Sequence, residues 1–478
     1  MARRKRWLGT VAVATALTVV GGVSACTPGT SSSNSQGAKA DAAKPKELHM
    51  LYATAEADSA AVQAMVPEFK NKFGFDLKID TMPYDALQQK VFSEFASSSP
   101  YYDIVIVDTP WAPALASKLE PLSSYIGNPK LNDMAKTDVG DFIPKVFYDT
   151  AVYDKSNPVK HYPDATAKPD PKAITAKGFE IYGLPLQANA LVMGYRKDLF
   201  DDPAQQSAYQ AATGQKLAVP TTLDQYQQVA KFFTQPGKKL YGTTVMAGVG
   251  DWATDDFKSL LAAEGGNGAM IGDNLSLDFD SPQGVQALTY YRNLIASGVV
   301  PPGSTSASWD EAASSFDSGL TAMTENYHAL ALDSGVNGQI GYAQVPQGVA
   351  TGPHFGTWML SVNPSSANKA WAYRAITWLT AADQQLAMTK NQLHPSRTSV
   401  YDQVQNQTQD PAEAEFYQVL GKSLAVGVGR PRLTNYTEVS HAIAVAVNEA
   451  ASGSKAPDVA LKEAASGVHR LLEQAGYK

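Results

Sequence analysis

The sequence predicts an α/β protein of two domains with mostly parallel sheets. After about residue 46, short apolar stretches of strand character alternate with amphipathic stretches of helical period, a pattern typical of α/β folds. This part of the chain has about 430 residues, too many for one ordinary hydrophobic core, which suggests two domains of about 200 residues each. The alternation contains no internal repeat.

The first elements are predicted from apolar spacing. A short strand is expected at 47–53 (ELHMLYA), and 58–73 has apolar residues close to helical spacing. Pro67 lies inside that second stretch, so its helix should be kinked or begin late. Further strands are expected at 75–79 and 103–107, the latter (DIVIV) with the continuous apolar character of a buried parallel strand.

Later in the chain, the sequence predicts a crossing segment and the starts and ends of several helices. Residues 183–195 predict a crossing segment followed by a strand. A capping box, in which Ser or Thr precedes Glu or Gln by three residues, predicts a helix N-terminus. A Ser-Pro pair also predicts a helix start, and a Gly predicts a helix end. These signals are the boxes Thr222–Gln225 and Ser308–Glu311, the start Ser281-Pro282, and the ends Gly298 and Gly319.

Cys26, the single cysteine of the chain, follows a secretory signal. Residues 3–6 are basic, 7–20 are apolar, and small residues come next. Residues 23–26 (VSAC) resemble the lipobox of bacterial lipoproteins, which implies cleavage after residue 25 and attachment of a lipid to the Cys26 thiol, with palmitate among its acyl chains. An exported chain with one cysteine cannot form an internal disulfide. A signal with a chance cysteine, or a buried free thiol, is the alternative.

The segment 26–46 is expected to be a flexible tether, because it has no large apolar residue and cannot bury enough surface to order itself. No later stretch is long and apolar enough to span a membrane. Loss of residues 1–25, with four basic and no acidic side chains, takes the formal net charge from −7 to −11. An acidic chain without a basic block argues against nucleic acid as a partner.

Motifs for several kinds of chemistry are absent from the sequence. There is no nucleophile elbow, phosphate-binding loop, dinucleotide fingerprint or zinc-protease motif. The seven histidines are scattered and form no short metal-ligand pair. We therefore expect no cofactor and no metal. Glycosidase carboxylates cannot be recognised from spacing, and the acidic pairs Asp201-Asp202 and Asp255-Asp256 are expected to be solvated surface.

Aromatic residues next to polar ones suggest a sugar site. An aromatic ring packs on the apolar face of a pyranose, while neighbouring carboxylates and amides pair with its hydroxyls. The alternative is that these rings fill the core between helices. Because Trp309, Trp371 and Trp378 lie within helical patterns, we expect those three in the core. The aromatic residues with polar neighbours are Trp111, Trp252, Tyr327, Trp358 and Tyr436.

Five segments, in this order, resemble one family over roughly residues 47–450. That family is the extracellular solute-binding proteins of bacterial ABC importers, in the carbohydrate group that includes the maltose-binding protein. The lipobox start also resembles the lipid-anchored form usual in Gram-positive bacteria. The segments are YGLPLQANALVMGYRKDLF (182–200), PTTLDQYQQVAKFFT (220–234), SPQGVQALTYYRNLIASGVVPPG (281–303), WDEAASSFDSGLTAMTENYHAL (309–330) and HPSRTSVYD (394–402).

The resemblance implies a periplasmic-binding-protein-like fold of two discontinuous α/β lobes with a hinge. The first lobe would contain 47–184 and 320–363, and the second 185–319 and 364–478. A ligand would bind in the cleft between them, and the lobes would close on it. The ligand-binding positions that the resemblance implies are Thr54, Glu56, Asp108, Trp111, Asn189, Asp251, Trp252, Tyr327, Trp358, Arg397 and Tyr436.

Two departures from the family pattern bear on the ligand. Tyr327 stands where relatives commonly have Trp, which changes a stacking ring, and an insertion-like stretch at 201–219 could reshape the second lobe. Which sugar binds is therefore left open by the sequence.

The resemblance implies a non-enzymatic role. A mono- to small oligosaccharide or a polyol would be captured and delivered to the membrane subunits of an ABC permease. The protein would be a monomer on the outer face of the cytoplasmic membrane, held only by its lipid. A secreted glycosidase, or a solute-binding protein for a peptide or polyamine, is the alternative.

Overall fold

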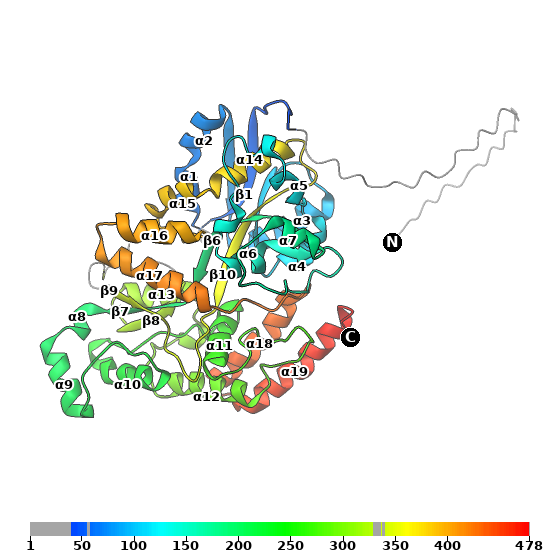
Figure 1. Ribbon diagram of the computed structural model, residues 1–478. Coiled ribbons are helices and arrows are strands. Elements are labelled where there is room, and N and C mark those ends of the chain that lie inside the picture. Colours follow the sequence, from blue (N-terminus) through cyan, green and yellow to red (C-terminus); the bar gives the residue numbers. More distant parts are fainter. Residues whose placement is uncertain (1–39, 55–57, 328–335, 337–339, 478) are drawn as a thin grey trace, which may run out of the picture. The chain divides into compact units, whose positions relative to one another are not determined.

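The computed structural model describes residues 40–54, 58–327, 336 and 340–477 (Figure 1). The described chain contains a five-stranded sheet in the order β2-β1-β3-β10-β6. Its strands are β1 (Glu47–Ala53), β2 (Asp76–Met82), β3 (Ile104–Asp108), β6 (Leu184–Ala190) and β10 (Phe355–Val362).

Only part of this sheet is parallel. β1 pairs in parallel with β2 and β3, whereas β10 runs antiparallel to both β3 and β6. The chain leaves the sheet along β6 and returns along β10 in the opposite direction, so an antiparallel pair is unavoidable there. The predicted prevalence of parallel sheets is therefore wrong outside β1–β3.

A second sheet has three antiparallel strands in the order β8-β7-β9. They are β7 (Val192–Arg196), β8 (Met323–Asn326) and β9 (Ile340–Ala343). A two-stranded antiparallel ribbon, β4 (Val152–Asp154) with β5 (Phe179–Ile181), completes the described strands. We call the five-stranded sheet with its helices the first lobe, and the three-stranded sheet with its helices the second lobe.

Helices accompany each sheet (Figure 1). α17 (Pro411–Val426) packs against strands of both sheets. Those that accompany the five-stranded sheet are α1 (Ser59–Ala64), α2 (Val66–Phe73), α3 (Tyr84–Ser97), α4 (Ala112–Leu115), α5 (Ser123–Ile126), α6 (Pro144–Ala151), α7 (Pro171–Ala176), α14 (Lys369–Leu379), α15 (Ala382–Thr389) and α16 (Thr398–Gln407). The others are α8 (Lys197–Phe200), α9 (Pro203–Thr213), α10 (Leu223–Phe233), α11 (Asp251–Ala263), α12 (Pro282–Ala296), α13 (Trp309–Asp317), α18 (Tyr436–Ala451) and α19 (Pro457–Gln474).

Each lobe has its own hydrophobic core. The first joins the apolar strands β1 and β3 to α14, with Ile106 and Trp378 buried in it. The second joins α11, α12 and α18, with Phe257 and Val447 buried in it. A smaller core links β6 and α17, near the place where the chain passes between the lobes. Two cores of this kind agree with the prediction of two domains from chain length.

Local signals predicted these elements well. The strand at 47–53 has the predicted bounds, and Pro67 lies in the first turn of a second helix, α2, which follows a break at Met65. Both capping boxes form, with reciprocal side-chain to backbone hydrogen bonds at the starts of α10 and α13. Gly298 and Gly319 adopt left-handed backbone conformations, with φ of 69° and 75°, just beyond α12 and α13.

The lobe boundaries expected from the sequence differ in three places from those that the sheets and cores define. β6 belongs to the five-stranded sheet, so the first crossing lies at Leu191 and not between residues 184 and 185. β8 and β9 pair with β7, which puts the start of the 320–363 segment in the second lobe. The apolar face of α14 packs in the first core, so 364–379 belongs to the first lobe.

Thr222 gives a test of the capping argument. Its hydroxyl accepts a hydrogen bond from the Gln225 N–H at the start of α10. Thr222→Ala should lower the free energy of unfolding by about 1 kcal/mol, measured by chemical denaturation. The control is Thr289→Ala, an exposed threonine inside α12, where alanine favours the helix. Equal effects of the two substitutions would contradict the capping argument.

Candidate functional site

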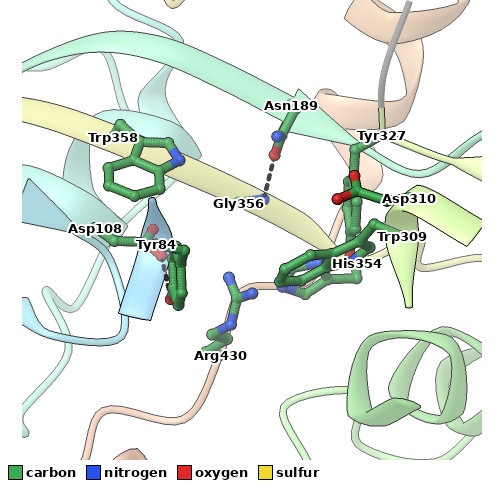
Figure 2. Close-up of a pocket in the computed structure, with 10 residues that line it drawn as sticks. All are labelled: Tyr84, Asp108, Asn189, Trp309, Asp310, Tyr327, His354, Gly356, Trp358 and Arg430. Atoms are coloured by element: carbon green, nitrogen blue, oxygen red, sulfur yellow. Dashed lines mark hydrogen bonds between the residues drawn. The ribbon is translucent and has the colours of Figure 1, made fainter. Parts of the chain in front are cut away.

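A pocket of about 110 Å³ lies where the two lobes meet (Figure 2). Residues from the five-stranded sheet, from α3 and α13, and from the segments just after β8, just before β10 and before α18 line it. The lining residues come from segments far apart in the sequence, and both lobes contribute to the pocket. The lining residues are Tyr84, Asp108, Asn189, Trp309, Asp310, Tyr327, His354, Gly356, Trp358 and Arg430.

The first lobe contributes a carboxylate framed by rings. Asp108 ends β3, and Trp358 is its register partner on β10. The Trp358 ring meets Trp111 edge to face, with centroids 5.4 Å apart. Tyr84, at the start of α3, donates its hydroxyl hydrogen to Asp108 Oδ2 at 2.8 Å. These contacts hold one carboxylate and three rings at the end of the sheet.

The second lobe contributes Trp309, Asp310 and Tyr327. The Ser308 capping box fixes the start of α13 and thereby places Trp309 and Asp310, its first two residues, at the pocket. The Trp309 ring lies edge to face with Trp252, at 5.2 Å between centroids. Tyr327 follows β8, and its hydroxyl is hydrogen-bonded to His354 Nδ1.

Arg430 is a buried cation at the floor of the site. It is 6% exposed and forms salt bridges with Asp251 at 2.7 Å and Asp255 at 3.3 Å, both on α11. The nearby acids raise the pKa of Arg430 well above its usual range against the opposing effect of burial. Arg430 therefore stays charged, and the ionised Asp251 carboxylate is its main counter-charge.

A second pocket, of about 260 Å³, adjoins the first and shares Tyr84 and Trp309 with it. Asp251 and Trp252 line it from the start of α11, and Trp111 lines it from the first lobe. Tyr436, at the start of α18, donates its hydroxyl hydrogen to Asp251 Oδ1 at 2.7 Å. Because the two pockets share Tyr84 and Trp309, they offer a ligand two neighbouring surfaces lined by aromatic rings.

Burial shifts the pKa values of the acidic residues in the site. Desolvation raises the pKa of Asp108 to about 6, although Arg430 and the Tyr84 hydrogen bond oppose the rise. The pKa of Asp255 is raised to about 7, again because of burial. Burial pushes the pKa of Asp251 up too, but the Arg430 guanidinium and hydrogen bonds from Ser440 and Tyr436 outweigh it, so the net pKa is lowered. His354 is fully buried, and its pKa is lowered well below the usual value, so it is neutral.

The structure brings together eight of the eleven residues proposed from the sequence. Asp108, Asn189, Tyr327 and Trp358 line the first pocket. Trp111, Asp251, Trp252 and Tyr436 line the second. Thr54 is exposed at the end of β1 and lines neither pocket. Glu56, like Cys26, lies outside the described residues.

The structure places Arg397 in a packing role instead of a ligand site. Its side chain is 1% exposed and forms a salt bridge with Asp141 at 3.5 Å. Its guanidinium also donates to the backbone carbonyls of Thr380, Thr137 and Asp138. Every bond therefore goes to the protein interior of the first lobe, which explains why an arginine in this position lines neither pocket.

Trp309 was expected in the core and instead lines both pockets. It occupies the first turn of α13, so it faces the cleft although its spacing is helical. Trp378 is buried in the first core and Trp371 packs against it, as predicted. Sequence reasoning also missed the lining residues Tyr84, Asp310, His354 and Arg430; for Tyr84 the available signal was its place just beyond β2, at a strand end.

The acidic pair Asp255-Asp256 was expected on the surface and is buried in α11. Asp255 faces Arg430, and Asp256 accepts hydrogen bonds from Tyr291 and the Met246 N–H. Within the described residues, no group of three or more His, Cys, Asp or Glu side chains could hold a metal ion. None of the described helices combines the length and apolar character needed to cross a membrane.

Residues 53–386 match the family described as bacterial extracellular solute-binding protein. The chain belongs to this family. A probable ABC transporter-binding protein of Deinococcus radiodurans is 26% identical over 298 residues, which cover 60% of this chain and 67% of that protein. The predicted family is therefore confirmed for this solute-binding protein.

Solved structures agree on the fold. The maltose-bound MalE3 of T. maritima has a TM-score of 0.71 at 22% identity, covering 89% of this chain and all of that one. An ABC transporter solute-binding protein of Agrobacterium radiobacter K84, in complex with ribitol, has a TM-score of 0.70 at 26% identity, covering 89% of this chain and 98% of that one. The predicted two-lobed α/β fold of this solute-binding protein is confirmed.

Asp108 gives a pH-dependent test of the site. Its pKa rises from the usual 3.8 to about 6 on folding, so its contribution to stability is greatest below pH 4 and is lost as pH rises through 6. Measured against Asp108→Asn, the wild-type protein should lose about 2 kcal/mol of unfolding free energy between pH 4 and pH 7. Denaturant titrations without ligand at several pH values measure this difference.

The control for this test is Asp458→Asn, an exposed residue in the first turn of α19. Its difference from the wild type should show no comparable loss between pH 4 and pH 7. If the Asp108→Asn and wild-type stabilities changed in parallel with pH, Asp108 would not be desolvated as described.

Proposed function

We propose that this solute-binding protein captures a sugar or polyol between its lobes and delivers it, unchanged, to the membrane subunits of an ABC importer. The observation that carries the proposal is the pairing of rings with polar groups in the pocket. Trp358 and Trp309 come from opposite lobes, and Asp108 lies beside Trp358 (Figure 2). Rings suit the apolar face of a sugar, and a buried carboxylate suits its hydroxyls.

Relatives of the same fold support the proposal. One of them is bound to maltose, and another is in complex with ribitol. Each is similar to this chain over nearly nine-tenths of its length. A sugar or a polyol offers the hydroxyl groups that Asp108, Asn189 and Arg430 can bind, so these side chains fit either class of ligand.

Ligand binding would be coupled to lobe closure. The lobes touch across the cleft, where Gln88 donates a hydrogen bond to Thr437 at 3.2 Å and the Tyr84 and Trp309 rings lie 6.2 Å apart. A ligand in contact with both lobes binds the closed arrangement better and shifts the population toward it. Discontinuous lobes hinged at the β6–β7 crossing and at the returning segments would carry this motion, with the protein acting as a monomer.

A ligand screen with a mutational readout tests the proposal. Neutral sugars and polyols are first ranked by the rise they cause in melting temperature, and the best is taken to calorimetry. Trp252→Ala should weaken its binding about thirtyfold, because an aromatic anchor typically contributes about 2 kcal/mol or more. The matched control is Trp371→Ala, whose ring lies on the first core away from both pockets.

The outcomes separate binding from packing and from catalysis. If Trp252 had a core role, Trp252→Ala would instead lower the stability of the ligand-free protein by about 3–5 kcal/mol and leave affinity unchanged.

Chromatography of the recovered ligand distinguishes a binding protein from a glycosidase, since only an enzyme alters the ligand. Solution scattering should show a smaller radius of gyration at saturation. Absence of binding by every sugar and polyol in the screen would contradict the proposal.

We also propose that Cys26 anchors the protein by a lipid to the outer face of the cytoplasmic membrane. The supporting observation is the order of basic, apolar and small residues before Val23-Ser24-Ala25-Cys26. A tether of about 20 residues would then hold the folded part near its permease and raise its local concentration there.

Cys26→Ser removes the thiol to which the lipid would be attached. The variant should either remain unprocessed or leave the membrane fraction, as followed by cell fractionation and mass spectrometry of the N-terminus. A serine variant that is cleaved after residue 25 and still sediments with membranes would contradict the lipid anchor. The wild-type protein treated with detergent provides the control for release.

A further inference from the structure

The two pockets have an excess of acidic groups. Four carboxylates line them, from Asp85, Asp108, Asp251 and Asp310, against the single strong base Arg430. A cleft lined by one sign of charge focuses its potential, because its walls have a low dielectric constant. The charge of a ligand therefore matters to its affinity for this cleft.

The positive charge of Arg430 is already matched. Its guanidinium contacts Asp251 at 2.7 Å and Asp255 at 3.3 Å. Among the described residues, Asp85, Asp108 and Asp310 form no salt bridge with a basic side chain. His354 does not supply a charge, since burial keeps it neutral. None of these three carboxylates is therefore in a salt bridge. Asp85 and Asp310 are exposed, whereas Asp108 is buried and near enough to the Arg430 guanidinium for that charge to oppose the rise of its pKa.

Two of these carboxylates lie on opposite sides of the first pocket. Figure 2 shows Asp108 beside Tyr84 and Trp358 on one side, and Asp310 beside Trp309 and Tyr327 on the other. Asp108 is 4% exposed, so its charge is poorly screened by water. Its oxygens accept hydrogen bonds from the Tyr84 hydroxyl and the Thr109 N–H, at 2.8 Å each, and neither donor carries a charge.

The aromatic lining adds to the same preference. Tyr84, Trp309, Tyr327 and Trp358 line the pocket that holds Asp108. The face of each ring carries the negative part of its quadrupole and attracts a cation, most strongly in a desolvated site. Rings and carboxylates in one pocket therefore favour a ligand that is flat and apolar on one side and positively charged elsewhere.

We propose that the ligand is a saccharide bearing a protonated amine, that is, an amino sugar or an aminocyclitol with a free amine. The inference rests on the proposed function and specifies its substrate class. The ring of the saccharide packs on the tryptophans, and the ammonium group lies between Asp108 and Asp310. A sugar acid or sugar phosphate is disfavoured, because its anion would face Asp108 and Asp310, and the strong base of the pocket, Arg430, is already paired with Asp251.

The experiment compares matched ligands that differ in one group. The probes are glucose, glucosamine, N-acetylglucosamine and glucuronate, and, as disaccharides, cellobiose, the β-1,4-linked disaccharide of glucosamine and its N-acetylated form. Titration calorimetry at pH 6.5 and low salt should give at least tenfold tighter binding for the free amines than for their neutral counterparts. The preference should shrink in 0.5 M salt or above the pKa of the amine.

Variants assign the preference to the carboxylates. Asp310→Asn should weaken binding of the free amine about tenfold, with a much smaller effect on the neutral sugar. Asp108→Asn removes a carboxylate that also binds sugar hydroxyls, so it should weaken binding of both ligands, and that of the free amine about tenfold more than that of the neutral sugar. Asp458→Asn, on the exposed first turn of α19, should change neither. Binding of the amine near pH 6 should also release a proton from Asp108, seen as a dependence of the heat on the ionisation enthalpy of the buffer.

The outcomes distinguish this inference from the proposed function. If neutral sugars bind as tightly as their amine counterparts, or if glucuronate binds best, the amine proposal is overturned and sugar binding stands. An amine preference that survives Asp108→Asn and Asp310→Asn together also overturns it. If no saccharide of any charge binds to the wild-type protein, both the proposed function and this inference fail.

Discussion

The buried Arg430 guanidinium is the interaction on which the cleft depends. A charge with 6% exposure requires partners, and α11 supplies them as Asp251 and Asp255. Two residues on, Arg432 reaches the opposite lobe and donates to backbone carbonyls at the end of α6, including Asp149 and Val152. Arg430 and Arg432, in one short segment, thus bind one lobe each, and Arg430 also lines the ligand pocket. Losing one partner of such a buried pair would leave an uncompensated charge.

The same segment connects binding to the arrangement of the lobes. Lys258 of α11 donates to the Gly429 carbonyl, next to Arg430, so the second lobe holds the segment by backbone as well as by side chain. Burial lowers the pKa of Lys258 to about 7, which shows how little water reaches this place. A ligand that contacts Arg430 therefore acts on a residue whose position is already set by both lobes, and small changes in their angle move it relative to Asp108.

The sequence predicted those parts of the fold that local chemistry decides. The bounds of β1, the break before Pro67 and both capping boxes follow from residues within four positions of one another. It could not predict the lobe boundaries, because β8 and β9 acquire their place only by pairing with β7. Arg430 and His354 were missed for the same reason: their partners lie more than 90 residues away in sequence, on α11.

For Trp309, the sequence predicted the start of the helix but not that the side chain lines the cleft. The Ser308–Glu311 box was enough to predict that a helix begins there, and an aromatic residue at helical spacing was then assigned to the core. A first-turn residue, however, precedes most of the buried face of its helix, and α13 buries Ala312, Ala313 and Phe316 one turn later. The cap that starts the helix therefore also turns Trp309 and Asp310 toward the cleft, so that one local motif supplies a stacking ring and a carboxylate together. Both residues follow directly from the Ser308–Glu311 cap, so loss of that cap would displace the ring and the carboxylate together.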